Sequence, residues 1–339
     1  MTKPTILFLF GGESPEHDVS IASAHNVYNA IDQQEFEIIL CYIDPQGRWW
    51  RASRIQKEPR GLVPVKPLLG EAAVEIDGIA TPVHIIYPVL HGQNGEDGTI
   101  QAVARLSHIP VVGCDVDASA LCMNKILTKK LLHAEGLPVV PYKVHYTSQE
   151  APTFAQLKAE LGPTLFVKPA RQGSSIGVSR VTSQAELTEA LYEAQEYDDT
   201  ILIETGLNVR ELEVAVMGQT MQPQVSVVGE ITPDRDFYSY ESKYDADATS
   251  VVTIPAAISQ PLSEEIRALA ARAFTALNCQ GMARIDFFID DKNTIYVNEI
   301  NTLPGFTNIS MYPKLWAASG KPTAQLVTEL ITLALKDKA

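Results

Sequence analysis

Two strand-like segments near the end of the chain, 281–290 and 293–301, predict a β-hairpin. A loop over 290–293 would pair Ile289 with Thr294. Side chains directly opposite each other in an antiparallel pair lie on one face of the sheet. This register therefore decides which polar side chains meet, and a slip by one residue would separate them.

In this register, one face of the hairpin gathers oxygen ligands and a guanidinium. Arg284 lies opposite Glu299, and Asp286 and Asn301 fall on the same face. Carboxylate and amide oxygens, with positions left open for phosphate oxygens, are what Mg²⁺ requires. The alternative is a solvated face with an incidental ion pair. The next turn favours a site, because Gly305 can bring a backbone N–H close to a reacting group.

A loop rich in glycine and serine is the second candidate. Residues 168–177 read KPARQGSSIG, a strand end that enters a loop and returns to a strand. The N–H groups and hydroxyls of such a loop can bind phosphates. Neither GxxxxGK[ST] nor GxGxxG is present, and a plain hairpin turn is the alternative.

Two polar turns follow strands in the first third of the chain. The turn GGESPEHD places Glu16 in the first turn of a predicted helix, where a carboxylate also simply complements the helix dipole. The turn LHGQNGEDG places His91 at the end of a strand, where pockets form in parallel sheets. Its glycines and carboxylates make His91 a site candidate.

The elements that must position these groups alternate between strands and helices. Strands predicted at 5–10, 36–43, 84–90 and 109–113 indicate a parallel sheet with ligand sites at the carboxyl ends of its strands. Residues 46–81 predict an irregular or β-rich excursion.

Two lobes of mixed α and β structure are expected to follow. Their strands are predicted at 164–169, 177–181, 200–204, 211–217 and 225–231, before the hairpin. Their helices are predicted at 117–135, after a capping box Ser183…Glu186, at 262–277 and from Pro322 onward. We place the domains at 1–121, 122–209 and 210–339.

Composition and charge exclude several classes of protein. A formal net charge of −14 disfavours non-specific binding to nucleic acid or to an anionic membrane. The four cysteines show neither a disulfide framework nor CxxC metal spacing, which fits a reducing compartment. No segment has the length and apolar character of a membrane span, so we expect a cytoplasmic protein.

In this order, the motifs resemble the D-alanine–D-alanine ligases of the ATP-grasp superfamily. The matching stretches are GGESPEHDVS, VLHGQNGEDG, MNK at 123–125, FVKPARQGSSIGVS, ESKYD, GMARIDFF and VNEINTLPGFTNIS. The resemblance covers nearly the whole chain and weakens at 46–81 and 184–200. It implies an α/β protein with the ATP-grasp fold, in which a parallel-sheet N-terminal domain precedes two α+β lobes that clasp ATP.

The resemblance also implies a reaction. ATP would convert one D-alanine to D-alanyl phosphate, and the amine of a second D-alanine would displace phosphate, as peptidoglycan precursor synthesis requires. Two Mg²⁺ ions would assist, with Mn²⁺ a plausible substitute, and the chain would form a homodimer. Since an acyl phosphate hydrolyses readily, the polar segment 232–250 is expected to act as a lid.

Roles follow from the resemblance wherever the motifs match. For the nucleotide, these are Lys125, Lys168 and Lys243 at phosphates, Ser175 in the closing loop, Glu204 through Leu207 at adenine, Glu211 at ribose and Phe237 on the base. For the metals, they are Asp286, Glu299 and Asn301. For the amino acids, they are Glu16 at the first ammonium with His91 nearby, Arg284 and the Gly305 N–H at the oxyanion, and Ser310 with Met311 at the second carboxylate. Glu16, Ser174 and Tyr244 resemble the hydrogen-bonded set that closes the mobile loop.

Several alternatives stay open from the sequence. Tyr244 favours an amine acceptor, but the product could be D-alanyl-D-lactate or D-alanyl-D-serine. A biotin-dependent carboxylase subunit would share the nucleotide fold but not the His91–Gly92 and Lys243–Tyr244 segments. A non-catalytic nucleotide-binding regulator would not need the polar hairpin face with its arginine.

Overall fold

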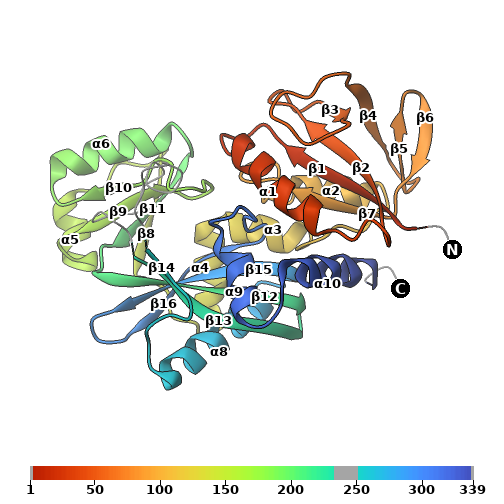
Figure 1. Cartoon of the computed structure of the whole chain (residues 1–339). Helices are drawn as coiled ribbons and strands as arrows, with labels where there is room; N and C mark the ends of the chain where they lie inside the picture. Colours follow the sequence, from red (N-terminus) through yellow and green to blue (C-terminus); the bar gives the residue numbers. More distant parts are fainter. Residues whose placement is uncertain (1–2, 233–250, 337–339) are drawn as a thin grey trace.

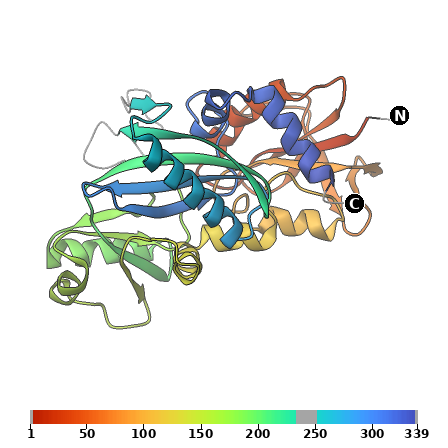
Figure 2. The same ribbon diagram turned by 90° about the horizontal axis from the view of Figure 1, so that it is seen from below.

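A computed structural model describes residues 3–232 and 251–336 of the chain. Three β-sheets follow one another along this sequence, each formed by a contiguous part of the chain (Figure 1). Figure 2 shows the helix α10 (Thr323–Lys336), near the C-terminus, lying against the N-terminal part of the molecule.

The N-terminal sheet has the strand order β6-β5-β4-β3-β2-β1-β7. Its parallel part consists of β1 (Thr5–Gly11), β2 (Glu37–Ile43) and β7 (Ile85–Val89). Every residue of β1 is buried, because helices and loops cover both faces of this part of the sheet. The sheet is flanked by α1 (His17–Ala30) and α2 (Thr99–Leu106).

Residues 46–81 extend this same sheet with antiparallel strands, as the β-rich interpretation allowed. They form β3 (Trp49–Arg51), β4 (Val63–Leu68), β5 (Ala73–Ile76) and β6 (Ile79–Pro82). The strand predicted at 109–113 is wrong: only a single parallel bridge joins Val111 to Ile86. Pro110 has no N–H to donate and Gly113 has a φ of 111°, so the segment does not continue as a strand.

The single helix predicted at 117–135 is also wrong. It is two helices, α3 (Val116–Met123) and α4 (Lys125–Ala134). Asn124 breaks the run with an extended ψ of 94°, and its side chain accepts from the N–H groups of Ile126 and Leu127. An asparagine cap of this kind starts a new helix, so Lys125 begins α4 instead of lying within a longer helix.

The central sheet is antiparallel, with the order β10-β9-β11-β8. Its strands are β8 (Tyr142–Tyr146), β9 (Leu165–Pro169), β10 (Ser179–Val181) and β11 (Thr200–Thr205). The helices α5 (Phe154–Leu161) and α6 (Gln184–Gln195) bury their apolar faces against it. Ser183 caps α6 as predicted, but the Glu186 carboxylate accepts from Thr182, so the predicted capping box is only half formed.

The C-terminal sheet has the order β14-β13-β12-β15-β16 and is covered on both faces. Its strands are β12 (Val209–Gln219), β13 (Gln222–Thr232), β14 (Val251–Thr253), β15 (Gly281–Asp290) and β16 (Ile295–Asn301). One face packs on α8 (Gln260–Ala276), α3 and α4. The other face packs on α9 (Met311–Ala318) and α10, which join it to the core of the N-terminal sheet. The C-terminal end of the chain therefore completes the core of the first domain.

Candidate active site

The register of the hairpin differs from the prediction by one residue. Ile289 pairs with Ile295, so the predicted partner Thr294 belongs to the turn. The Asp290 carboxylate accepts from the N–H groups of Lys292 and Thr294, at 2.9 and 2.8 Å, and this lengthens the turn. Such a slip alone would move Glu299 to the opposite face.

A β-bulge at Asn298 restores the predicted face. Phe287 pairs with Val297, whereas the next pair is Asp286 with Glu299, so one extra residue lies in β16. Arg284 consequently lies opposite Asn301 and not opposite Glu299 as predicted. The four predicted polar side chains therefore share one face, because the one-residue slip at the turn and the one-residue bulge cancel.

A row of carboxylates crosses three strands on this face. Glu213 of β12 pairs with Asp286 of β15, which pairs with Glu299 of β16. Arg284 donates to both oxygens of Asp286, at 2.7 and 2.6 Å, and its Nε lies 3.1 Å from Glu213 Oε2. We call these four residues the carboxylate row. Burial acts against the Arg284 charge, but the charges of Asp286, Glu213 and Glu299 outweigh it and raise the pKa of Arg284.

A cluster of lysines lies beside the carboxylate row. We call Lys125, Lys129, Lys168 and the carboxylate of Glu204 the lysine cluster. Glu204 is buried between Lys129, at 2.5 Å, and Lys168, which contacts its other oxygen. Burial would raise the pKa of Glu204, but the charges of Lys168 and Lys129 lower it to about 2. Lys125 connects the two groups, because its Nζ lies 3.8 Å from Glu299 Oε2.

The glycine- and serine-rich loop joins the lysine cluster to the N-terminal domain. Lys125 Nζ donates to the carbonyl of Gln172 at 2.6 Å. Ser174 Oγ donates to Glu16 Oε1 at 2.6 Å, over 158 residues of sequence. Ser174 and Ser175 have φ values of 52° and 59°, in the left-handed region of the backbone that residues other than glycine rarely adopt. The structure thus brings two of the three predicted loop-closing residues together.

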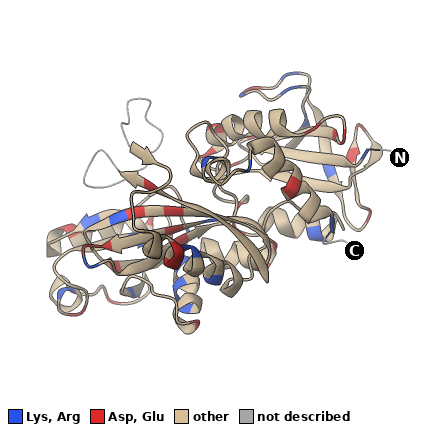
Figure 3. Cartoon of the chain, turned by 60° about the horizontal axis from the view of Figure 1, so that its bottom comes forward, with Lys and Arg blue, Asp and Glu red and all other residues tan. Residues whose placement is uncertain are grey.

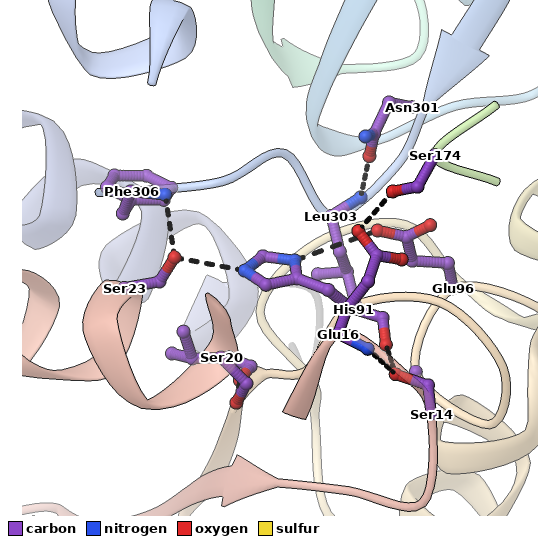
Figure 4. Close-up of polar contacts among 12 residues, drawn as sticks. Ser14, Glu16, Ser20, Ser23, His91, Glu96, Ser174, Asn301, Leu303 and Phe306 are labelled. Atoms are coloured by element: carbon purple, nitrogen blue, oxygen red, sulfur yellow. Dashed lines mark hydrogen bonds and ion pairs between the residues drawn. The ribbon is translucent and has the colours of Figure 1, made fainter. Parts of the chain in front are cut away.

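His91 lies in a buried polar network at the end of β7 (Figure 4). Its Nε2 is 3.0 Å from Ser23 Oγ, and its Nδ1 is 3.7 Å from Glu96 Oε1. Burial acts to lower the pKa of His91, but the hydrogen bond and charge of Glu96, with the charge of Glu16, raise it. Ser14 Oγ donates to the His91 carbonyl at 2.5 Å, which anchors the residue to the start of α1.

The turn after the hairpin brings Gly305 and Ser310 together. A Cβ added to Gly305 would lie 2.8 Å from Ser310 Oγ, so only glycine fits without displacing the serine. Ser310 Oγ accepts from the Thr307 N–H at 2.9 Å. Met311 begins α9, and its side chain is buried in the core. Only the backbone N–H of Met311, at a helix N-terminus, is suited to the predicted carboxylate.

The remaining predicted residues lie outside the described residues, on β12, or between β11 and β12. Phe237, Lys243 and Tyr244 lie outside the described residues. Glu211 lies on β12, opposite Phe288, and Leu207 is half-buried between β11 and β12. Their roles at ribose and adenine stay predictions.

The sequence interpretation missed four residues of the site: Ser23, Lys129 and Glu213, and Glu96 as the partner of His91. Lys129 and Lys125 are four residues apart, a spacing that places them on one helix face. Glu213 lies two residues after the predicted Glu211 on the same strand, so both side chains face the same side of the sheet. These spacings could have identified Lys129 and Glu213. Nothing local marks Ser23, whose partners lie far away in the sequence.

The donor set fits Mg²⁺ in chemistry but not as a complete protein cage. Asp286, Glu299 and Asn301 offer only oxygen donors on one face. Among residues 3–232 and 251–336, no group of three or more His, Cys, Asp or Glu side chains could hold a metal ion by itself. Mg²⁺ usually takes one or two carboxylates plus substrate phosphates and water. The face therefore suits a metal that arrives with a nucleotide.

Three sheets arranged in this way form an ATP-grasp protein, and solved structures agree. The D-alanine-D-alanine ligase from Coxiella burnetii has a TM-score of 0.90 and 35% identity, covering 100% of this chain and 95% of that chain. The VanG D-Ala:D-Ser ligase from Enterococcus faecalis has a TM-score of 0.90 and 33% identity, covering 98% of this chain and 100% of that chain. The predicted fold class is confirmed.

Sequence comparison gives the family. The family model described as D-ala D-ala ligase N-terminus matches residues 5–114, and that described as D-ala D-ala ligase C-terminus matches residues 131–332. The chain is 42% identical to D-alanine–D-alanine ligase A of Escherichia coli, over 100% of this chain and 98% of the relative. It is 42% identical to D-alanine–D-alanine ligase of Caldicellulosiruptor bescii, over 99% and 96%. The chain belongs to the D-alanine–D-alanine ligase family, as its motifs indicated.

Three further features of the structure bear on the broader expectations. None of the helices in the described part of the chain has the length and apolar character needed to cross a bilayer. All four cysteines are buried thiols. Acidic and basic residues are interspersed along the ribbon (Figure 3).

Proposed function

We propose that this chain joins two D-alanines to D-alanyl-D-alanine through a D-alanyl phosphate, with ATP as the phosphoryl donor. The observation that carries the proposal is the 3.8 Å approach of Lys125 to Glu299. It places a cationic group suited to phosphates beside an anionic group suited to metal ions. A metal-bound nucleotide is the ligand that needs both.

The residues of this chain have distinct tasks in the first step. A carboxylate oxygen of the first D-alanine attacks the γ-phosphorus, and ADP leaves. Lys125 and Lys168 hold the phosphates, and Glu16 binds the ammonium of the substrate. Arg284 and the Gly305 N–H bind the other oxygen of this carboxylate, on which negative charge develops when the amine attacks in the second step. Bound to Asp286, Glu299 and Asn301, two Mg²⁺ or Mn²⁺ ions would neutralise charge on the transferring phosphoryl group.

In the second step, the amine of the second D-alanine attacks the carbonyl carbon of D-alanyl phosphate. Phosphate leaves, and the nitrogen loses a proton as the amide forms. Ser310 and the Met311 N–H hold the second carboxylate. Contact between Ser174 and Glu16 closes the loop over the intermediate and keeps water out.

The direct test is phosphate release by the purified protein with ATP and Mg²⁺. We expect release that depends on D-alanine and yields D-alanyl-D-alanine. Phosphate release that does not depend on D-alanine, with no dipeptide, would contradict the proposal. Nucleotide binding without any turnover would favour a regulator instead.

A second acceptor has one observation in its favour, the similarity to a D-Ala:D-Ser ligase structure. The curated relatives at 42% identity over nearly their full length carry the D-alanine–D-alanine name, and we therefore rank D-serine and D-lactate below D-alanine. Competition between the three acceptors at neutral pH tests this ranking.

Location, assembly and domain division complete the proposal. We place the reaction in the cytoplasm, where ATP is available and buried thiols stay reduced. We also propose a homodimer, which light scattering of the purified protein can test. Domains at 1–121, 122–209 and 210–339 remain our division, although its first boundary falls inside α3. Limited proteolysis can test these boundaries.

A further inference from the structure

Two side chains of helix α1 form hydrogen bonds with the backbone N–H and carbonyl of Phe306. Ser23 Oγ accepts from the Phe306 N–H at 3.2 Å, and Asn26 Nδ2 donates to the Phe306 carbonyl at 2.7 Å. Asn26 also donates to Asn308 Oδ1 at 3.0 Å. Residues three apart lie on one face of a helix, so Ser23 and Asn26 act on the turn together.

The same hydroxyl contacts His91. Ser23 Oγ lies 3.0 Å from His91 Nε2 and is fully buried (Figure 4). The Phe306 N–H can only donate, so Ser23 Oγ accepts from it while it also contacts the ring nitrogen of His91.

The turn that receives these bonds carries two proposed substrate groups. Gly305 immediately precedes Phe306, and Ser310 lies close to Gly305. At its other end, the turn is fixed by Asn301 Oδ1, which accepts from the Leu303 N–H at 3.1 Å. Phe306, whose N–H and carbonyl both bond to α1, is therefore a point where the turn is fastened to the N-terminal domain.

We propose that Ser23 and Asn26 are positioning residues that fasten the turn 302–310 to α1 and so set the place of the Gly305 N–H. This inference rests on the proposed function, since Gly305 matters only if it faces a reacting oxygen. Neither residue touches substrate. They act through the backbone of Phe306.

Ser20 provides a matched control on the same helix. It is also fully buried, and its hydroxyl accepts from the Gly11 N–H at 2.8 Å and donates to the Val89 carbonyl. Both partners belong to the N-terminal sheet. Loss of the Ser20 hydroxyl should therefore weaken the domain without releasing the turn.

The kinetic test compares Ser23→Ala with Ser20→Ala. We expect kcat to fall about 10- to 100-fold in Ser23→Ala, because displacement of a reacting group by about 1 Å costs up to about 100-fold. The KM for ATP should stay nearly unchanged, because the lysine cluster is built on other elements, namely α4, β9 and β11. In Ser20→Ala, kcat should stay within about twofold of wild type. Equal kcat values in the two variants would overturn the inference.

A second measurement does not depend on turnover. Hydrogen exchange of the peptide that covers 302–309 should be faster in Ser23→Ala than in wild type or Ser20→Ala, because the Phe306 N–H loses its acceptor. Unchanged exchange would refute the fastening role even if the ligase proposal holds. Conversely, if Ser23→Ala exchanges faster but the wild-type protein has no ligase activity, the fastening role would stand and the proposed function would be refuted.

Asn26→Ala keeps the inference testable if Ser23→Ala does not fold. Asn26 is only partly buried, and its loss should also speed exchange of 302–309 and lower kcat by several-fold. Asn29→Ala, an exposed change on the same helix, is its control and should have no effect. An Asn26→Ala variant that matches Asn29→Ala in both measurements would contradict the proposal.

Discussion

The lysine cluster carries an excess of positive groups, and the carboxylate row carries an excess of negative groups. The lysine cluster has three ammonium groups and one carboxylate, and the carboxylate row has three carboxylates and one guanidinium. Each contains one group of the minority charge at its centre. Glu204 lies between two lysines, and Arg284 lies between Asp286 and Glu213.

This difference indicates how a small volume can bind a metal nucleotide. Buried like charges repel strongly, so each group keeps one opposite charge that holds it together in the absence of ligand. The remaining charge is complementary to phosphate on one side and to cations on the other. Lys125 lies at the boundary, 3.8 Å from Glu299, where the phosphates and the metal would meet.

The largest effect should come from the carboxylate row. Glu299→Gln keeps the shape of the side chain but removes a charge that the metal ions would share. We expect phosphate release to fall about 10³-fold or more, because a metal contributes several kcal/mol to the transition state. Asp291→Asn, an exposed change in the same hairpin, is the control and should retain activity. Wild-type turnover of Glu299→Gln at ordinary Mg²⁺ would rule out the metal assignment.

Arg284 should give the next largest effect. Arg284→Ala removes a donor from the developing oxyanion, and we expect kcat to fall about 10²–10³-fold. It also leaves Asp286 and Glu213 without their shared cation, so the urea midpoint should fall. Steady-state kinetics with varied D-alanine separates the two parameters. A change confined to KM would indicate uniform binding instead.

Acid should weaken the lysine cluster. The pKa of Glu204 falls from 4.5 to about 2 on folding. A depressed pKa gives stability that is present above the unfolded value and is lost as the pH falls through the folded value, here over about pH 4.5 to 2, with a size of roughly 3 kcal/mol. The urea midpoints of wild type and Glu204→Gln should therefore converge over this window. A constant gap between them down to about pH 2 would show that the Glu204 charge adds no stability.

The smallest effect should come from Lys129. Lys129→Met removes one of the two cations that hold Glu204, and we expect a loss of about 1–3 kcal/mol because Lys168 remains. Burial and the neighbouring lysines lower the pKa of Lys129, so this loss is offset in part by relief of like-charge repulsion. The control is Lys130→Met, an exposed change at the next residue, which should stay within about 0.5 kcal/mol of wild type. Equal urea midpoints for the two variants would mean that Lys129 does not stabilise the cluster.

Local patterns predicted most of the strands and the polar faces. The apolar run of β1, the alternation in β15 and the amphipathic helix α10 all follow from which side chains must be buried. Irregularities caused by single residues were harder to predict. Asn124 ended one helix and capped another through its side chain, and an extra residue at Asn298 made a bulge, and hydrophobic periodicity reveals neither feature.

The sequence alone determined the family, the three sheets in outline and the residue types of the site, because motifs and periodicity are local properties of the chain. Tertiary structure decided which of these residues meet. Ser174 reaches Glu16 across 158 residues, and Asn26 reaches Phe306 across 280. Such contacts depend on how the three sheets pack, and their packing is set by cores that combine residues from distant segments. For this reason Ser23 can be assigned to the site only from the tertiary structure.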